Sequence, residues 1–581
     1  MNGILRRWVG LLIRIVFLFA IIWGSNLWLV RIVDSIYSHR SVLAGQPSLE
    51  EPTNPLVQQV VLVLIGGLSY DASLEMPYLN TLRPQGLDAQ CTGYYPSYSQ
   101  SAWTTLISGA GPETSDAPLV NLPHEQLQYL TVDDLFTEAK RAKLTTAIAG
   151  FHWWENMIPE QTLDRGFFVS STGAEADQET VQAVLDLMNS VPPNLYLVHL
   201  SQVDHAVNTY GTDSEEYRAA LQTVDLYLNE MAQAMSLKRH VLVVTSDHGY
   251  LAGGGHGGAD REVITTPLVM VGPRVVPGAL AQIHQTDIAP TIAALLGLAI
   301  PSAAQGDILF NALVMDEGES TEKWVSWSQQ RVELSDVYLE SIGQEPLTEA
   351  AKGDAEVAYS SLLVRNYSSA RSLAEFAVRG ATAEMIKGRS LRTAREQRQR
   401  LPVGVLPVAA VAYLLWRRWS STTTVLLLCA GTTALIYHLL FLWEGQVYSL
   451  STIGNWWVFA TNVLVRTASA LVPSICALVW LVWRQRRRLP LEIATLNYSF
   501  GLILAFLLAL PLAVAYVLNG VEITWRLPHP VLAFVQVSSL VQLGMAAFLN
   551  LLLPLFTIPL DRVLRWVTSA IGSRIASKTT P

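Results

Sequence analysis

The stretch VVLVLIGGLSYDA, residues 60–72, decides the fold of the first half of this chain. Its six leading residues are apolar and mostly β-branched, a pattern typical of a strand that is buried on both faces of a parallel sheet. The run stops at Gly66-Gly67. A tight turn accounts for Gly67, because glycine adopts backbone conformations that other residues avoid. The turn does not account for Gly66, which stands where such a strand would deliver a functional side chain.

Four more short apolar runs follow and alternate with helical patterns. The runs occupy residues 145–149, 195–200, 241–245 and 268–271, and the clearest helical patterns occupy 131–143, 177–190 and 215–235. Alternation of this kind favours an α/β layered domain with a mainly parallel sheet. We place this domain at residues 55–310 and interpret residues 316–400, which are rich in helix formers, as a helical connector.

The composition predicts membrane segments, because half of the 581 residues are hydrophobic and only 15% are charged. Residues 9–30 form an apolar run with Arg14 as its one charge, long enough to cross a hydrocarbon core of ~30 Å. A cleavable signal peptide is the alternative, but the run exceeds the usual apolar core of about 7–15 residues. We therefore interpret residues 1–34 as a transmembrane anchor. Five further candidate spans are residues 401–416, 425–443, 457–483, 493–518 and 530–560.

The distribution of arginine and lysine orients these six predicted helices. Positive residues gather after the second, fourth and sixth spans, as at Arg417 and Arg562, and such loops favour the cytoplasmic side. The arginine-rich stretch 389–400 falls on the outer side, but long translocated domains largely escape this rule. We expect an integral protein of the plasma membrane or of an endoplasmic-reticulum-type membrane. Its main domain would be extracytoplasmic and both termini cytoplasmic, with a five-helix domain at residues 401–560 and a tail at 561–581.

Charge and cysteine content argue against two features. The net charge of -9 provides no basic stripe of the kind that nucleic acids require, so no nucleic-acid partner is expected. Cys91 is the only cysteine of the predicted outer domain, so no disulfide can form within it.

Polar side chains follow several of the predicted strands. Because ligands bind at the carboxyl ends of strands in such sheets, we expect these side chains to converge on one edge. They are Ser99, Asp204, His205, Asp247, His248 and His256. Carboxylates and imidazoles are ligands that Zn²⁺-like ions prefer, and two such ions can clamp a phosphoryl group. A hydroxyl at the same edge, such as Ser99, would be the nucleophile. The alternative is that the Asp-His pairs are solvated or cap helices.

Seven segments, taken together and in order, resemble the alkaline phosphatase superfamily, in particular its type I phosphodiesterase and nucleotide pyrophosphatase branch. The segments are VVLVLIGGLSYDA, MPYLNTL, PSYSQSAWTTLISGAGPE, VDHAVNTYG, SDHGYLAGGGHGG, TPLVMVG and QTDIAPTIAALLGLAIP, within residues 58–306. The GPI ethanolamine phosphate transferases are similar in the same segments, and they too join an outer catalytic domain to membrane spans. Joint order makes this resemblance more specific than any single motif.

The resemblance implies a nucleophile and a phosphate-binding amide. The family's nucleophile is a Thr or Ser in a P-x-x-[ST] turn, and Ser99 holds that place after Pro96. Asn121, offset by one residue, matches an Asn that helps to hold the phosphoryl oxygens. The C-x-P-x-R motif of the sister sulfatases is absent, so sulfatase chemistry is not expected.

The resemblance also implies a divalent metal, with Zn²⁺ as the expected ion and with one or two ions bound. Asp247 and His248 match ligands of the ion that activates the nucleophile. Asp204 and His256 match ligands of the second ion.

Two positions depart from the family pattern. The family's first strand ends in Asp-Gly, whose Asp binds the nucleophile-side ion, and Gly66 replaces that Asp here. The family's D-x-x-x-H motif ends in Asn208. Asn208 itself, or His205 after a loop shift, is a candidate substitute for the missing histidine of this motif. Asp71 is expected to cap a helix or to accept a hydrogen bond near the site rather than to replace the first ligand.

Two hypotheses remain open at this point. The first is an outward-facing, metal-dependent phosphoric ester hydrolase or phosphoryl-group transferase that acts through Ser99 on a phosphorylated small molecule or a lipid-linked substrate. The second is a degenerate member of the family that binds a phosphorylated ligand or a partner without turnover.

Arg466 lies inside a predicted span, and we interpret it as snorkelling to the interface or as paired within the helix bundle rather than as part of a transport pathway.

Overall fold

The computed structural model describes residues 2–43, 51–190, 192–485 and 489–576. It divides into two compact units. The helical unit comprises Met1–Ser35, Glu396–Ile523 and Val531–Pro581, and the sheet unit comprises Ile36–Arg395 and Thr524–Pro530.

The sheet unit is built on a mostly parallel sheet, as predicted. Eight strands pair in the order β4-β3-β5-β1-β6-β7-β2-β8, and β7 alone runs antiparallel to both of its neighbours. The strands are β1 Val60–Ile65, β2 Leu87–Thr92, β3 Thr146–Phe151, β4 Arg165–Val169, β5 Leu195–Leu200, β6 Val241–Thr245, β7 Thr265–Val271 and β8 Ala279–His284. Strands β5, β1 and β6 lie side by side in parallel at the centre of the sheet.

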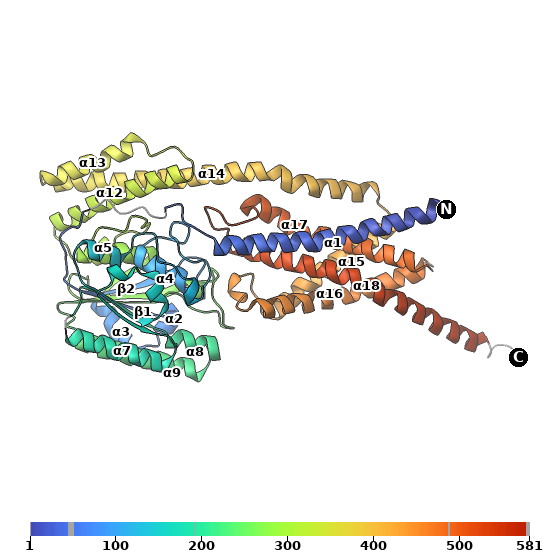
Figure 1. Cartoon of the computed structure of the whole chain (residues 1–581), viewed down its shortest axis with the longest axis horizontal. Helices are drawn as coiled ribbons and strands as arrows, with labels where there is room; N and C mark the ends of the chain where they lie inside the picture. The colour runs from blue at the N-terminus through green and yellow to red at the C-terminus, as the bar shows by residue number, and fades with distance from the viewer. Residues whose placement is uncertain (1, 44–50, 191, 486–488, 577–581) are drawn as a thin grey trace. The chain divides into compact units, whose positions relative to one another are not determined.

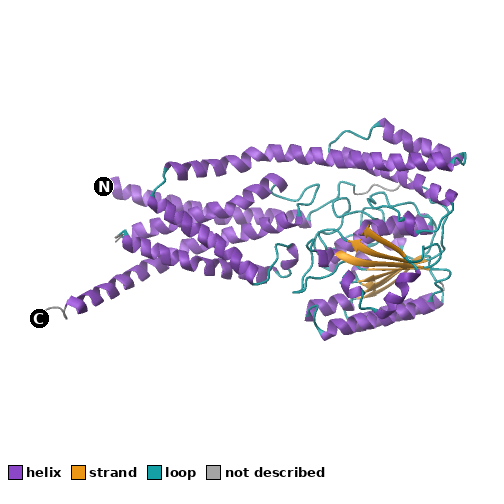
Figure 2. Cartoon of the chain, turned by 180° about the vertical axis from the view of Figure 1, so that it is seen from behind, coloured by secondary structure: helices purple, strands orange, loops and turns teal. Residues whose placement is uncertain are grey.

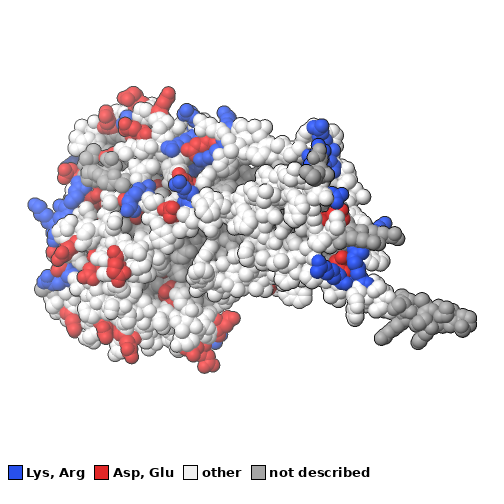
Figure 3. Space-filling model, turned by 45° about the vertical axis from the view of Figure 1, so that its right-hand side comes forward, with Lys and Arg blue, Asp and Glu red and all other residues white. Residues whose placement is uncertain are grey.

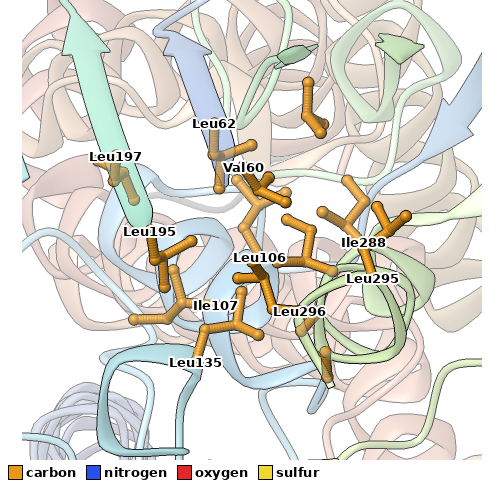
Figure 4. Packing of buried hydrophobic residues seen from close by; sticks show 14 of the residues in the cluster. Val60, Leu62, Leu106, Ile107, Leu135, Leu195, Leu197, Ile288, Leu295 and Leu296 are labelled. Atoms are coloured by element: carbon orange, nitrogen blue, oxygen red, sulfur yellow. The ribbon is translucent and has the colours of Figure 1, made fainter. Parts of the chain in front are cut away.

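Alternate residues of the central strand face two separate apolar cores. Leu62 and Leu64 of β1 belong to the first core, whereas Val61, Val63 and Ile65 belong to the second. The first core contains Leu106 and Ile107 of α4, Leu135 of α5 and Ile288, Leu295 and Leu296 of α11 (Figure 4). The second contains residues of α3, α7, α8 and α9. Helices therefore cover both faces of the sheet, as Figure 2 shows.

The helices of the sheet unit have the following bounds: α2 Tyr70–Ser73, α3 Pro77–Leu82, α4 Ser99–Ser108, α5 Leu135–Arg141, α6 Trp153–Met157, α7 Ala174–Asn189, α8 Gln202–Tyr210, α9 Glu215–Ala234, α10 Arg261–Ile264, α11 Ile288–Leu296, α12 Glu317–Ser341 and α13 Glu349–Leu363. Helix α2 is capped by the Ser69 side chain, which accepts a hydrogen bond from the backbone N–H of Ala72. The expectation that Asp71 caps a helix is therefore wrong, because Asp71 lies inside the first turn, one residue after the helix begins.

Six helices of the described chain are long and apolar enough to cross a membrane, in agreement with the six predicted spans. They are α1 Asn2–Tyr37, α14 Tyr367–Arg417, α15 Ser421–Trp443, α16 Trp456–Arg484, α17 Pro490–Asn519 and α18 Pro530–Ala576. Figure 1 shows α14 as one long helix, so the predicted connector and the second span are continuous. On the visible face of the helical unit, a wide band carries no charged side chains (Figure 3).

The buried cation of the helical unit has a partner. Arg466 of α16 is 4% exposed, and its guanidinium contacts the carboxylate of Glu444 at 2.5 Å and lies over the ring of Phe441. A charge buried in a helix bundle requires such compensation. Arg466 is therefore paired, and its partner Glu444 is the half-exposed residue that follows α15.

Candidate active site

The candidate site lies where the three central strands end. β1 ends before Gly66, β5 before Ser201 and β6 before Ser246. Because these strands are parallel and adjacent, the segments that follow them meet at one edge of the sheet. Helix α4 packs on the first core and begins at Ser99.

Ser99 and His248 form the closest pair of reactive groups. The hydroxyl oxygen of Ser99 lies 3.3 Å from Nε2 of His248, and both residues are buried. Nδ1 of His248 lies 3.2 Å from the carbonyl oxygen of Gly249. A carbonyl only accepts hydrogen bonds, so this contact favours a proton on Nδ1.

The Asp247 carboxylate accepts three hydrogen bonds close to this pair. One carboxylate oxygen accepts hydrogen bonds from the backbone N–H groups of Gly67, at 3.0 Å, and of His248, at 2.9 Å. The other oxygen accepts a hydrogen bond from Nε1 of Trp103 at 2.9 Å. It also lies 3.6 Å from Nε2 of His248. Three N–H donors therefore hold the carboxylate: the backbone of Gly67, the backbone of His248 and the indole of Trp103.

Asp204, in the first turn of α8, belongs to a second hydrogen-bonded group. Tyr250 donates its hydroxyl hydrogen to Oδ1 at 2.5 Å, and the Asn208 amide donates to Oδ2 at 3.0 Å. Asn208 also donates to the Tyr250 hydroxyl, which closes the group. Oδ1 lies 3.9 Å from Nε2 of His248. Burial of the Asp204 carboxyl raises its pKa, because the charged form loses solvation.

His256 lies directly against His248. The two imidazole rings stack with their centroids 4.1 Å apart. Nε2 of His256 is buried and has no hydrogen-bond partner within the described part of the chain. The loop that carries His256 is tied to the turn before Ser99, because the Ser97 hydroxyl accepts from the Gly257 N–H and donates to the Gly258 carbonyl. Burial lowers the pKa of His256 well below its ordinary value and keeps the ring neutral.

The remaining two candidate residues have different positions. Oδ1 of Asn121 accepts a hydrogen bond from the backbone N–H of Gln100 at 3.2 Å, which places this amide beside the start of α4. His205 instead directs Nδ1 at the hydroxyl of Thr172, 3.0 Å away. The structure thus groups five of the predicted residues around Ser99, but turns His205 towards another loop. The five are Asn121, Asp204, Asp247, His248 and His256.

The part of the chain that carries most of these residues is similar to known proteins. The model of the type I phosphodiesterase / nucleotide pyrophosphatase family matches residues 131–260. The human GPI ethanolamine phosphate transferase 2 catalytic subunit is 26% identical over 296 residues, 46% of this chain and 30% of that protein. GPI ethanolamine phosphate transferase 3 of Schizosaccharomyces pombe is 24% identical over 331 residues, 50% of this chain and 36% of that protein. The chain carries a phosphodiesterase domain of the alkaline phosphatase superfamily.

This phosphodiesterase domain is distantly related to the GPI ethanolamine phosphate transferases, and the matched region spans about a third of the length of those relatives. Among solved structures, human ectonucleotide pyrophosphatase / phosphodiesterase 5 matches with a TM-score of 0.37 at 15% identity. That match covers 44% of this chain and 98% of the solved one.

The donors of the phosphodiesterase domain match a divalent cation in type but are incomplete in number. His256 offers an unpartnered, buried imidazole nitrogen, and His248 lies within 4 Å of two carboxylates. Gly66 offers no donor, and the Asn208 amide is engaged by its neighbours. The described residues contain no group of three or more His, Cys, Asp and Glu side chains arranged to hold a metal ion. The two donors that the family pattern requires at Gly66 and Asn208 are therefore missing from the set.

Sequence reasoning missed three residues that shape the candidate site. Trp103 lies four residues after Ser99 in α4, a spacing that puts both on one face of a helix. Tyr250 directly follows the SDHG segment. His199 was hidden inside the apolar run at residues 195–200, although a histidine in a buried strand is itself a signal. Burial lowers the pKa of His199 to about 4.

Proposed function

We propose that the protein is a membrane-bound, outward-facing, metal-dependent phosphoric ester hydrolase or phosphoryl-group transferase that uses Ser99 as its nucleophile. The observation that carries this proposal is the 3.3 Å approach of the Ser99 hydroxyl to His248, at the start of α4. An abandoned site would have no reason to retain a buried hydroxyl, two imidazoles and two carboxylates around one point.

The start of α4 favours anionic phosphate. The first backbone N–H groups of a helix point away from it and carry partial positive charge, which attracts phosphoryl oxygens. Ser99 is the first residue of α4, and the Asn121 amide lies beside it. These groups would hold the phosphoryl oxygens while phosphorus faces the Ser99 oxygen.

The reaction exchanges one ester bond for another. The Ser99 oxygen bonds to phosphorus as the bond to the leaving alcohol breaks, and the proton of the Ser99 hydroxyl is finally carried by that alcohol. Water or a second alcohol then bonds to phosphorus as the Ser99–phosphorus bond breaks, and its proton returns to the Ser99 oxygen, which gives hydrolysis or transfer respectively.

We propose Zn²⁺ as the cation, with Asp204, Asp247, His248 and His256 as its ligands. A bound cation would lower the pKa of the Ser99 hydroxyl and offset charge on the phosphoryl oxygens. The imidazole and carboxylate types of these side chains, and the unpartnered nitrogen of His256, support the choice of a Zn²⁺-like ion.

We propose a phosphorylated small molecule or a lipid-linked phosphate ester as the substrate. The relatives named above are GPI ethanolamine phosphate transferases, and six candidate membrane helices accompany the phosphodiesterase domain. The proposed location is the plasma membrane or an endoplasmic-reticulum-type membrane, with both termini cytoplasmic.

A second candidate function is ligand binding without turnover. It is favoured by the missing donor at Gly66 and by Asp247, whose carboxylate oxygens already accept hydrogen bonds from the protein.

Activity assays on two serine variants separate the candidates. The full chain in detergent is assayed on phosphate mono- and diesters, with Zn²⁺ or with a chelator. Ser99→Ala should abolish a chelator-sensitive turnover. Ser101→Ala is the matched control, because its hydroxyl is also buried in α4 and has no hydrogen-bond partner among the described residues. Equal loss in both variants, or turnover that survives Ser99→Ala, contradicts the proposal.

A further inference from the structure

A loop between the last two candidate membrane helices belongs to the sheet unit. α17 ends at Asn519 and α18 begins at Pro530, and apart from Pro530 both helices lie in the helical unit. The residues between them that join the sheet unit are Thr524–Pro530, and we call this segment the docking loop. The chain therefore brings a segment from between α17 and α18 into the domain that carries Ser99.

Trp525 anchors the docking loop in an apolar cluster. The residue is 4% exposed, and the Arg392 guanidinium lies over its ring, 4.6 Å from the centroid. The cluster includes Leu43, which follows α1, Tyr338 of α12 and Ala110, which follows α4. A large aromatic side chain that is almost fully buried contributes strongly to the packing of such a cluster. Trp525 is therefore an integral part of the sheet unit.

A second contact ties the docking loop to the segment that follows α4. One carboxylate oxygen of Glu113 accepts a hydrogen bond from the backbone N–H of Leu527 at 2.7 Å. The other oxygen pairs with the guanidinium of Arg389 in α14 at 2.5 Å. The Glu113 side chain is 16% exposed, so water screens these contacts only in part. Hydrogen bonds to a charged group are stronger than those between neutral groups, so Glu113 holds the loop firmly.

Ala110 and Glu113 follow the helix that begins with the candidate nucleophile. α4 has ten residues, Ser99–Ser108, and all of them are buried. At 1.5 Å per residue the helix is ~15 Å long. A closely packed interior transmits displacements, so a shift at the last turn of α4 also moves its first turn. The docking loop packs beyond one end of α4, and Ser99 stands at the other.

We propose that the docking loop positions Ser99 for reaction, with Trp525 and Glu113 as positioning residues. The inference rests on the proposed function, in which Ser99 is the nucleophile. It gives α17 and α18 a role besides anchoring, because these two helices carry the loop that fixes α4. Displacement of a reacting atom by about 1 Å can cost about 10²-fold in rate.

Steady-state kinetics of the full chain in detergent, with a soluble phosphate diester, test the assignment. Trp525→Ala should lower kcat at least about tenfold and leave KM within about twofold, because it disturbs the alignment of Ser99 rather than contacts to the substrate. Glu113→Ala should act in the same direction, and Trp525→Phe should restore most of kcat because a ring refills the cluster. Trp443→Ala is the matched control and should keep the wild-type kcat, because Trp443 ends α15 and is 87% exposed.

Hydrogen–deuterium exchange of the same proteins reports on α4 without any substrate. Backbone amides of residues 99–110 should exchange faster in Trp525→Ala than in the wild type, whereas those of α7, which packs on the other core, should not change. Unchanged exchange of residues 99–110, wild-type kcat in a folded Trp525→Ala variant, or an effect confined to KM would overturn the inference and leave the proposed function intact. A wild type without turnover contradicts the proposed function, and the exchange data then decide by themselves whether the docking loop holds α4.

Discussion

Trp103 donates a hydrogen bond from its indole nitrogen to Oδ2 of Asp247 over 2.9 Å. Asp247 is a candidate metal ligand, and this oxygen faces Nε2 of His248 at 3.6 Å. The indole therefore satisfies this buried carboxylate, and a cation bound at Asp247, as proposed, would compete with it for the same oxygen. Binding of the proposed ion would displace or share that hydrogen bond.

Replacement of Trp103 by Phe should reveal this competition. The change removes the donor but keeps an aromatic ring, so it leaves Asp247 short of one partner at a cost of about 1–3 kcal/mol. We expect a lower melting temperature without Zn²⁺ and a smaller deficit with saturating Zn²⁺. Thermal unfolding of the full chain with and without the ion measures both.

Trp154→Phe is the matched control for that experiment. Trp154 stacks on Trp103 with centroids 4.6 Å apart, and its indole nitrogen has no hydrogen-bond partner among the described residues. Trp154→Phe removes the same ring area as Trp103→Phe, but it breaks no hydrogen bond. A Zn²⁺-independent deficit that is equal in the two variants would contradict the competition.

The two adjacent glycines should respond very differently to alanine. Gly67 has φ +74°, and an added Cβ would lie 2.9 Å from Cα of Asp204, so Gly67→Ala should cost about 1–3 kcal/mol. A Cβ at Gly66 meets only ordinary contacts, and Gly66→Ala should change the unfolding free energy by less than about 1 kcal/mol. Melting temperatures of the two variants test this, and similar destabilisation by both would show that Gly66 is retained for its backbone.

A buried carboxyl of helix α7 should make stability depend on pH. Burial raises the pKa of Asp177 to about 7, although the carboxyl accepts hydrogen bonds from Ser201 and Gln202 at the start of α8. In the unfolded chain an aspartate titrates near ~3.9. A carboxyl pKa that is higher in the folded state contributes stability below pH ~4 and loses it as the pH rises through about 7. Tyr227, the ionisable neighbour on α9, stays neutral over this range because burial raises its pKa further.

Asp177→Asn removes this titration and keeps an acceptor for the backbone N–H groups. Melting temperatures measured from pH 4 to pH 8 should fall for the wild type relative to the variant, by an amount that corresponds to roughly 4 kcal/mol at most. Parallel pH profiles for the two proteins would show that Asp177 is ionised in the folded state.

The sequence predicted the strands whose residues are uniformly apolar and missed those that alternate. β1, β5 and β6 are buried along their whole length, and their predicted bounds agree with the structure. β2 reads LDAQCT, with alternate residues half-buried, and β4 has an exposed start at the edge of the sheet. Such strands depend on pairing with neighbours that only the folded chain provides.

The site was predictable to the extent that its residues lie in motifs at strand ends. Ser99, Asp204, Asp247 and His248 could be placed at one edge because parallel strands end together. The direction in which each side chain points could not be predicted from the sequence. His205 lies next to Asp204 in sequence but contacts Thr172. His199 comes from within an apolar run, yet its Nε2 lies 3.4 Å from where a Cβ on Gly66 would be. Helix geometry decides where His205 points, and strand pairing decides where His199 lies. Neither can be read from the spacing of residues in the sequence.

Trapping the covalent intermediate tests whether Ser99 is the nucleophile. The full chain, incubated with Zn²⁺ and a phosphate diester, is quenched with acid and digested, and the peptide that contains Ser99 is analysed by mass spectrometry. We expect a substituted phosphoryl group on the Ser99 oxygen, absent after chelation and absent in Ser99→Ala. Turnover of the diester with Ser99 unmodified, or with the phosphoryl group on another residue, would contradict it.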